Sequence, residues 1–297
     1  MKILVTGANG LLGQKLCLLL NQDKSVELVA TTRNQLNFQL ASGRFCALDI
    51  TNQSHVENVI AIEKPDVIIN AAAMTQVDQC ETEREACWLN NVTAVDYLVR
   101  AAEKTKSHFI HVSTDFIFDG SAGPLDEKAL PNPLSYYGES KLAAEQVVID
   151  STLQWAILRT VLVYGVTKDM SRSNIVLWVK KSLEEGKKIN VVNDQWRTPT
   201  LAEDLAMGCT LVAKKRATGI YNISGEEMMT PYDIAIQTAE FFKLNKDLIA
   251  QTDSTQFKQP AQRPPKTGFV ITKAKNELTY RPHSFREGLA VLAGQLS

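Results

Sequence analysis

The residues with the clearest chemical potential are Tyr137 and Lys141, four positions apart in the run Y-Y-G-E-S-K. On a helix this spacing places both side chains on one face, one turn from each other. Reduction of a ketone by hydride leaves negative charge on the carbonyl oxygen, where a proton must be delivered. A phenol, with an ordinary pKa of about 10, is a poor acid at neutral pH. We expect the Lys141 ammonium, and the nearby helix N-terminus, to lower the pKa of Tyr137.

A second polar group, Ser113-Thr114-Asp115, ends a predicted strand over His108–Ser113. Doubly wound sheets place their sites at the carboxyl ends of parallel strands. Thr114 can donate a hydrogen bond to a substrate carbonyl oxygen, and Lys141 can also hold the ribose hydroxyls of a nicotinamide cofactor. A Y-x-x-x-K pair alone is common. Its position after this strand and after a dinucleotide-binding turn predicts that Thr114, Tyr137 and Lys141 are catalytic.

That turn lies in the first thirteen residues, M-K-I-L-V-T-G-A-N-G-L-L-G, where an apolar run precedes Gly7, Gly10 and Gly13. An amphipathic stretch with leucines four residues apart follows, so the pattern predicts a strand, a tight turn and a helix. Glycines permit the turn, the approach of a pyrophosphate and close helix packing. The N–H groups that begin the helix then face the anion. The alternative is an ordinary strand–turn–helix corner.

The end of the second predicted strand, Val26–Ala30, bears on the choice of cofactor. A Rossmann unit meets the adenosine ribose here, and an acidic residue would favour NAD. The chain instead has Thr32 and Arg33, which suit a 2′-phosphate. We therefore expect NADP(H) as the preferred cofactor, with NAD(H) possible. An exposed loop arginine is the alternative.

Two further predicted strands end at the edge of the sheet where the cofactor is expected. Asp49, before Ile50, can accept a hydrogen bond from an adenine amino group, or it can cap the helix that begins near Thr51. The strand Asp66–Asn70 runs into Ala71-Ala72-Ala73 and a polar loop, Thr75–Asp78. Small side chains leave room for a cofactor that lies across the sheet, although a tight helix–sheet contact also favours alanine.

Strands and helices alternate along the chain. The predicted strands are Ile3–Val5, Val26–Ala30, Phe45–Leu48, Asp66–Asn70, His108–Ser113, Trp155–Arg159, Ile189–Val192 and Ile220–Ile223, and the later predicted helices are Glu81–Lys104, Ser173–Glu185, Leu201–Val212, Pro231–Phe242 and Ser284–Gln295. This order predicts an α/β fold with a Rossmann-type, doubly wound parallel sheet. We expect an NAD(P)-binding domain over residues 1–165 and about 200–224. A smaller C-terminal α/β substrate-binding domain would take about 166–199 and 225–297.

Composition narrows the class of protein. The chain has 297 residues, 44% hydrophobic and 22% charged, with a formal net charge of -1. It is long enough for a large core and two domains. Without a basic excess, it has no electrostatic footprint for nucleic acid. Five scattered cysteines without metal spacing favour a reduced, cytoplasmic protein with no metal site. The start does not read as a signal peptide, and no run is long enough to span a membrane.

Six motifs carry a resemblance to a known family: T-G-A-N-G-L-L-G, N-A-A-A-M-T-Q-V-D, S-T-D-F-I-F-D-G, Y-G-E-S-K-L-A-A-E, N-D-Q-W-R-T-P-T and R-P-P-K-T. The chain resembles the dTDP-4-dehydrorhamnose reductase family, in the extended branch of the short-chain dehydrogenase/reductase superfamily, nearly end to end. The resemblance implies a Rossmann domain with a smaller C-terminal substrate domain. It also implies NAD(P)H-dependent reduction of the 4-keto group of a nucleotide-linked 6-deoxysugar, with dTDP-4-dehydrorhamnose to dTDP-rhamnose as the leading reaction.

The motifs and the resemblance together define three sets of expected site residues. The catalytic set is Thr114, Tyr137 and Lys141. The cofactor set is Gly7, Gly10, Leu11, Leu12, Gly13, Thr32, Arg33, Asp49, Ile50, Ala72, Ala73, Met74 and Thr75, together with Tyr137 and Lys141. The substrate set is Thr75, Asp78, Thr114, Asp115, Asn174, Gln195, Arg197 and Arg263. The expected partner is a nucleotide sugar, and the protein is a possible homodimer.

Two departures from the family pattern fall in the substrate half. Family members often have R-T-S-W after the strand Trp155–Arg159, with the Trp facing the sugar, whereas this chain continues Thr160-Val161-Leu162. The C-terminal motif usually carries Asn-Ser where this chain has Lys266-Thr267. These changes do not affect the expected reductase chemistry, but they leave the identity of the sugar undetermined.

Two other classes of function share the scaffold. One is a nucleotide-sugar epimerase or dehydratase. A 4,6-dehydratase usually carries an acidic pair just after the catalytic Thr, whereas here Phe116 follows Asp115. The other is a non-catalytic NADP-binding regulatory subunit, because the resemblance extends to the regulatory subunit of methionine adenosyltransferase.

Overall fold

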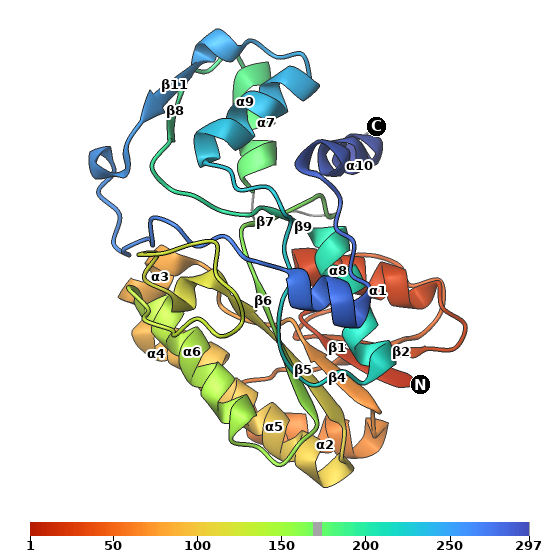
Figure 1. Ribbon diagram of the computed structural model, residues 1–297. Helices are drawn as coiled ribbons and strands as arrows, with labels where there is room; N and C mark the ends of the chain where they lie inside the picture. The colour runs from red at the N-terminus through yellow and green to blue at the C-terminus, as the bar shows by residue number, and fades with distance from the viewer. Residues whose placement is uncertain (169–173, 297) are drawn as a thin grey trace.

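The computed structural model describes residues 1–168 and 174–296. Seven parallel strands of this part of the chain form the central sheet (Figure 1). In spatial order they are β10 (Gly219–Asn222), β6 (Trp155–Thr160), β5 (His108–Thr114), β4 (Val67–Asn70), β1 (Lys2–Thr6), β2 (Glu27–Thr32) and β3 (Arg44–Ala47). The order reverses between β1 and β4, which is where doubly wound sheets bind ligands.

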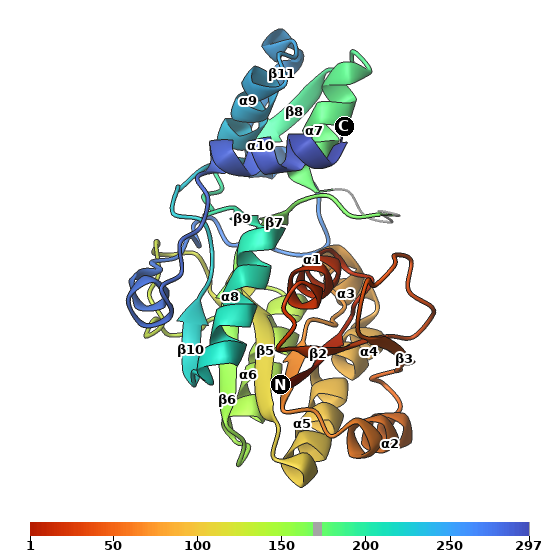
Figure 2. The same cartoon turned by 90° about the vertical axis from the view of Figure 1, so that its right-hand side faces the viewer.

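Helices cover both faces of the sheet (Figures 1 and 2). One face packs against α1 (Leu11–Asn21) and α8 (Ala202–Lys215), and the other against α2 (Gln53–Glu63), α5 (Ala94–Thr105) and α6 (Tyr136–Ile149). Alternate residues of β1 point into the two cores, since Ile3 lies in the first and Leu4 in the second. The arrangement confirms the predicted α/β class and the doubly wound parallel sheet.

A smaller lobe lies beyond one end of the sheet (Figure 2). It contains the parallel pair β8 (Ile189–Val192) and β11 (Ile249–Thr252), with α7 (Ile175–Glu184), α9 (Pro231–Phe241) and α10 (Phe285–Leu296). A short parallel pair, β7 (Val163–Tyr164) and β9 (Thr200–Leu201), packs against α7 and α10.

The predicted domain boundaries stay a prediction. From the last predicted segment, Phe269, Ala274 and Tyr280 pack into the core of the large sheet, beside α8. The lobe and the sheet meet at the carboxyl end of β5, where Asp115 contacts Arg197 and Thr267.

Two predicted helices differ from the structure. The single helix expected over Glu81–Lys104 is interrupted: α3 (Val77–Thr82) ends before Glu83, whose φ of -118° and ψ of 56° are not helical. The chain continues as α4 (Arg84–Trp88), a π-helical turn (Leu89–Thr93) and α5. The helix expected from Ser173 begins at Ile175, capped by Asn174, and Ser173 lies outside the described residues. Within the described ranges, no helix has the length and apolar character needed to cross a bilayer.

Candidate active site

The glycine turn joins β1 to α1 with a very close backbone approach. A Cβ on Gly13 would lie 2.1 Å from the Gly7 carbonyl oxygen, so only glycine fits this position. Gly10 is the N-cap of α1 and provides no capping side chain, which leaves the first N–H groups of the helix to other acceptors. Gly10 is exposed, and Leu11 and Leu12 are half-buried. This open helix start fits an anion such as a pyrophosphate.

The predicted adenosine-side residues lie at the ends of adjacent strands. Thr32 ends β2 beside β1, and the exposed Arg33 follows it. Asp49 and the buried Ile50 follow β3. Although burial opposes it, hydrogen bonds from Thr51 and the charge of Arg33 hold the pKa of the Asp49 carboxyl below its ordinary value. Arg33 and Asp49 are therefore near enough to each other to contact the same part of a bound cofactor.

The segment after β4 runs beside the glycine turn. Ala72, Ala73 and Met74 are half-buried, and Thr75 is exposed. The backbone N–H of Ala72 donates to Thr6 Oγ1 at 3.2 Å. Asn91 fixes the Met74 backbone from both sides, because its Oδ1 accepts from Met74 N at 2.8 Å and its Nδ2 donates to Met74 O at 3.0 Å. Asn91 was not among the predicted site residues; it is buried beside Asn90 in the π-helical turn Leu89–Thr93.

The predicted catalytic tyrosine lies in the first turn of α6. Ser135 caps this helix, with its Oγ accepting from Gly138 N at 3.2 Å. A Cβ on Gly138 would lie 2.2 Å from the Phe116 carbonyl oxygen, so glycine lets α6 approach the chain that follows β5. The Tyr137 side chain is 7% exposed and packs edge-on against the Phe116 ring, with ring centroids 5.7 Å apart.

The expectation that Lys141 lowers the pKa of Tyr137 is wrong for this structure. Burial raises the pKa of the Tyr137 phenol above its ordinary value, although a hydrogen bond with Thr114 acts in the opposite direction. The ammonium of Lys141 is bonded elsewhere, with its Nζ 2.7 Å from Val112 O and 3.1 Å from His111 Nε2, both on β5. Burial lowers the pKa of Lys141 to about 8. Burial thus favours the protonated form of the Tyr137 phenol, which is hydrogen-bonded with Thr114.

Asp115 is buried at the junction of sheet and lobe. Its Oδ2 accepts a short hydrogen bond from Thr267 Oγ1, and Arg197 Nε lies 3.5 Å from the same oxygen. Thr114 Oγ1 lies 3.2 Å from Oδ1. Burial outweighs these partners and raises the pKa of the Asp115 carboxyl. Its predicted role in binding the sugar stays a prediction. Thr267, which belongs to the quoted R-P-P-K-T motif, was missed.

Two other predicted substrate residues already have structural contacts. Arg197 donates to three carbonyl oxygens, those of Trp196, Pro264 and Pro265. Asn174 accepts from Leu177 N at 3.2 Å as the N-cap of α7 and donates to Gly165 O at 2.7 Å. These contacts hold the segments that surround the junction, and a direct contact of either side chain with substrate stays a prediction.

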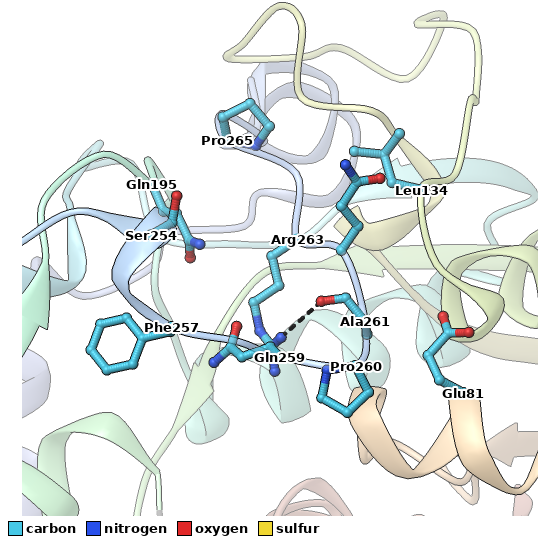
Figure 3. A pocket seen from close by; sticks show the side chains of 11 residues that line it. Glu81, Leu134, Gln195, Ser254, Phe257, Gln259, Pro260, Ala261, Arg263 and Pro265 are labelled. Atoms are coloured by element: carbon cyan, nitrogen blue, oxygen red, sulfur yellow. Dashed lines mark hydrogen bonds between the residues drawn. The ribbon is translucent and has the colours of Figure 1, made fainter.

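A cavity of about 650 Å³ has walls that include Gln195, Arg263, Glu81 and Leu134, the last of which directly precedes Ser135, the N-cap of α6 (Figure 3). The Glu81 carboxylate accepts the N–H of Tyr136 at 2.7 Å, so the cavity opens beside the first turn of α6. The remaining lining residues are Ser254, Phe257, Gln259, Pro260, Ala261, Gln262 and Pro265.

Arg263 is held at the wall of this cavity by a carboxylate and a carbonyl. Its Nη2 lies 2.8 Å from Asp78 Oδ2. Its Nη1 donates to Ala261 O at 3.1 Å, the hydrogen bond drawn in Figure 3. The structure therefore brings together the predicted substrate residues Asp78, Arg263 and Gln195. Among the described residues, no three His, Cys, Asp or Glu side chains are arranged to hold a metal ion.

Comparison with known proteins places this geometry in a family. The family model described as the RmlD substrate binding domain matches residues 1–297. A dTDP-4-dehydrorhamnose reductase of Aggregatibacter actinomycetemcomitans is 32% identical over 300 residues, covering 97% of both chains. The methionine adenosyltransferase 2 subunit beta of Xenopus laevis is 32% identical over 248 residues, covering 82% of this chain and 72% of that protein.

A solved structure gives the same assignment. The dTDP-4-dehydrorhamnose reductase of Bacillus anthracis, described in complex with NADP, superposes with a TM-score of 0.86 and 26% sequence identity, covering 99% of each chain. The family expected from the motifs is confirmed. The chain belongs to the dTDP-4-dehydrorhamnose reductase family, whose reductases are nicotinamide-dependent oxidoreductases.

Proposed function

We propose that the protein is an NADPH-dependent reductase of the 4-keto group of a nucleotide-linked 6-deoxysugar. The first candidate reaction converts dTDP-4-dehydrorhamnose to dTDP-rhamnose, as the name of the Aggregatibacter relative suggests. The observation that carries the proposal is the hydrogen bond between Tyr137 and Thr114 at the end of β5, next to Tyr136, whose N–H is held by the cavity-lining Glu81.

The residues present fit a dinucleotide. The open N-terminus of α1, with Gly10 as its N-cap, would receive the pyrophosphate. The exposed Arg33 would pair with a 2′-phosphate, which is the basis for preferring NADPH over NADH. Lys141 uses two of its three N–H groups on β5, so one remains for a ribose hydroxyl. When bound, the nicotinamide supplies the hydride that reduces the carbonyl carbon.

In the reaction, the chain itself supplies the proton that the substrate oxygen takes up. The Tyr137 phenol can donate the proton that the carbonyl oxygen needs as it becomes an alkoxide, because an alkoxide is a stronger base than a phenolate. Thr114, at the end of β5, can donate a hydrogen bond to the same oxygen and stabilise its developing charge. The phenolate left on Tyr137 is then reprotonated from solvent. These steps turn the ketone into an alcohol.

The cavity would hold the nucleotide end of the substrate. Its volume of about 650 Å³ lies within the range of ordinary ligand pockets. Arg263 presents a positive charge to it, which suits a diphosphate, and Gln195 supplies an amide for the sugar or base. Asp78 orients Arg263 through their 2.8 Å contact.

A non-catalytic cofactor-binding subunit is the second candidate. It is favoured by the 32% identity to the Xenopus laevis protein, which equals the identity to the Aggregatibacter reductase. Thr114, Tyr137 and Lys141 favour the enzyme. A 4,6-dehydratase fits less well, because the position after Asp115 holds Phe116, whose ring packs on Tyr137 instead of providing an acid.

Turnover of NADPH with a panel of nucleotide sugars tests the proposal. The panel contains dTDP-4-dehydrorhamnose, the corresponding UDP-linked ketone, and dTDP-rhamnose as a control without a keto group. We expect NADPH oxidation with a 4-keto sugar and formation of the 4-hydroxy product. If the protein binds NADPH but oxidises none of it with any ketone, the enzyme proposal fails in favour of the binding subunit.

Two expectations about the cellular state belong to the same proposal: a cytoplasmic location and assembly as a homodimer. Within the described part of the chain, no disulfide joins Cys17, Cys46, Cys80, Cys87 or Cys209, which fits a reducing compartment. Light scattering on the purified protein measures its assembly state.

A further inference from the structure

A row of polar side chains crosses the apolar sheet from the glycine turn toward α6. Thr6, Asn70 and His111 are register partners on the adjacent strands β1, β4 and β5. None of the three side chains is more than 1% exposed. Thr6 Oγ1 lies 2.6 Å from Asn70 Oδ1, and Asn70 Nδ2 lies 3.2 Å from His111 Nδ1. Buried polar groups inside a core persist when they are hydrogen-bonded, so this row is a built network.

The row ends on Lys141. His111 Nε2 lies 3.1 Å from Lys141 Nζ, and Lys141 is 2% exposed. At its other end, Thr6 Oγ1 accepts the N–H of Ala72, in the predicted cofactor segment. One continuous chain of hydrogen bonds therefore joins the edge of the glycine turn to the lysine of the Y-x-x-x-K pair.

The chemistry of the imidazole restricts how these bonds run. An ammonium only donates, so His111 Nε2 must be the acceptor and the ring proton must be on Nδ1. In the structure Asn70 Oδ1 faces Thr6 and its Nδ2 faces the ring, so Nδ1–H can donate to Asn70 only when the amide is turned by 180°, with its oxygen toward His111 and its nitrogen toward Thr6. Burial, followed by the charge of Lys141, holds the pKa of His111 well below its ordinary value, so the ring is neutral and able to accept.

We propose that His111 is the positioning residue for Lys141: its neutral imidazole accepts a hydrogen bond from the ammonium at Nε2, and its Nδ1–H is held by the turned amide of Asn70 on the neighbouring strand. The inference rests on the proposed function for its consequence, because a fixed ammonium directs its remaining N–H toward a cofactor hydroxyl. His111 touches neither substrate nor cofactor in this account and acts through Lys141.

The proposal predicts how Lys141 titrates. Besides His111, the titratable groups that face Lys141 are Glu145 on α6 and Cys87 on α4, and both raise its pKa against the effect of burial. A hydrogen bond to a charged group favours the charged form by roughly tenfold or more. Removing the acceptor at position 111 is therefore expected to lower the pKa of Lys141 by about one unit.

Two amide replacements at position 111 distinguish loss of the hydrogen-bond acceptor for Lys141 from loss of the side-chain shape of His111. His111→Asn keeps a polar group near the Nδ1 position but is too short to reach Nζ. His111→Gln places an amide oxygen near the Nε2 position and can restore the bond. His108→Asn is the matched control, because His108 is also buried on β5 and pairs in register with Val67, three register positions before the Asn70–His111 pair.

The test is an NMR titration of the protein labelled with ¹³C at the lysine ε-carbon, with the Lys141 signal assigned from Lys141→Met. We expect the midpoint of Lys141 to fall by about one pH unit in His111→Asn, to recover in His111→Gln, and to stay unchanged in His108→Asn. In parallel, kcat for ketone reduction should fall about tenfold in His111→Asn, with a smaller change in KM for substrate.

An unchanged Lys141 midpoint in His111→Asn, with the variant folded, overturns the inference whatever the activity. A midpoint that shifts equally in His108→Asn also overturns it, since the effect would then be general to the strand. If the expected shift occurs but the wild-type protein reduces no ketone, the positioning of Lys141 is supported and the proposed function fails by itself.

Discussion

The ion pair between Glu145 and Arg159 ties the helix of the candidate acid to the sheet. Arg159 Nε donates to Glu145 Oε1 at 3.0 Å and its Nη2 to Oε2 at 2.7 Å, and the two side chains are 4% and 1% exposed. The guanidinium also lies 5.4 Å from the centre of the Phe118 ring. Glu145→Gln would leave this charge buried without a counter-ion. Removing one partner of such a pair costs about 3–5 kcal/mol.

We therefore expect Glu145→Gln to lower the free energy of unfolding by about 3 kcal/mol. Urea unfolding followed by tryptophan fluorescence measures this loss. The matched control is Asp96→Asn, which breaks an exposed pair with Arg100 whose side chains are 30% and 64% exposed, and which should cost less than about 1 kcal/mol. A double change, Glu145→Leu with Arg159→Met, should recover much of the loss because it removes both charges.

The expected loss of about 3 kcal/mol requires that Glu145 and Arg159 are shielded from water, as they are in the structure. A cost below about 1 kcal/mol for Glu145→Gln, with an unchanged dependence on urea, would refute the reasoning. Glu145 also raises the pKa of Lys141 against burial, so the same variant should lower the pH at which Lys141 loses its proton.

Three further predictions address the cofactor turn and the cavity. Arg33→Ala should weaken NADPH binding about tenfold and NADH binding much less, and equal losses in direct titrations would show that Arg33 does not contact the phosphate. Gly13→Ala should abolish NADPH binding, because its Cβ would lie 2.1 Å from the Gly7 carbonyl oxygen; wild-type affinity by fluorescence titration would contradict this. The hydrogen bond from Arg263 holds the pKa of Asp78 below its ordinary value. Its contribution to stability is therefore present above that ordinary pKa and lost as pH falls below it. The wild-type Tm should then fall more steeply than that of Asp78→Asn between about pH 6 and about pH 3, and parallel curves would contradict the prediction.

The parts of the site that depend on local patterns could be predicted from the sequence. An apolar run, spaced glycines and an amphipathic stretch define the strand, turn and helix at the N-terminus without any distant contact. The four-residue spacing of Tyr137 and Lys141 likewise fixes their shared helix face. The positions of Thr114 and Asp115 follow from the rule that sites lie at the carboxyl ends of parallel strands.

The direction of each side chain could not be predicted in the same way. Lys141 bonds to β5 because the packing of α6 on that strand places His111 Nε2 within 3.1 Å of its nitrogen. The pKa of Tyr137 depends on burial, which arises from packing among distant segments. Asp78 and Arg263 were both predicted as substrate residues, but they are 185 positions apart and their pairing is visible only in the fold.

One signal in the sequence could have pointed to His111. A histidine in the run F-I-H-V, inside a strand with buried neighbours, needs a partner, as does Asn70 at the end of V-I-I-N. Neither residue identifies that partner, because the register of β4 and β5 decides which polar side chains meet.

The central claim is that Tyr137 delivers the proton to the carbonyl oxygen, and Tyr137→Phe tests it most directly. The measurement is kcat for 4-keto sugar reduction by wild type and variant, with NADPH affinity titrated on both. We predict unchanged NADPH binding and a kcat lower by about 10²–10⁴-fold, the usual contribution of a positioned proton donor. A variant that binds NADPH and reduces the ketone at nearly the wild-type rate would contradict the account.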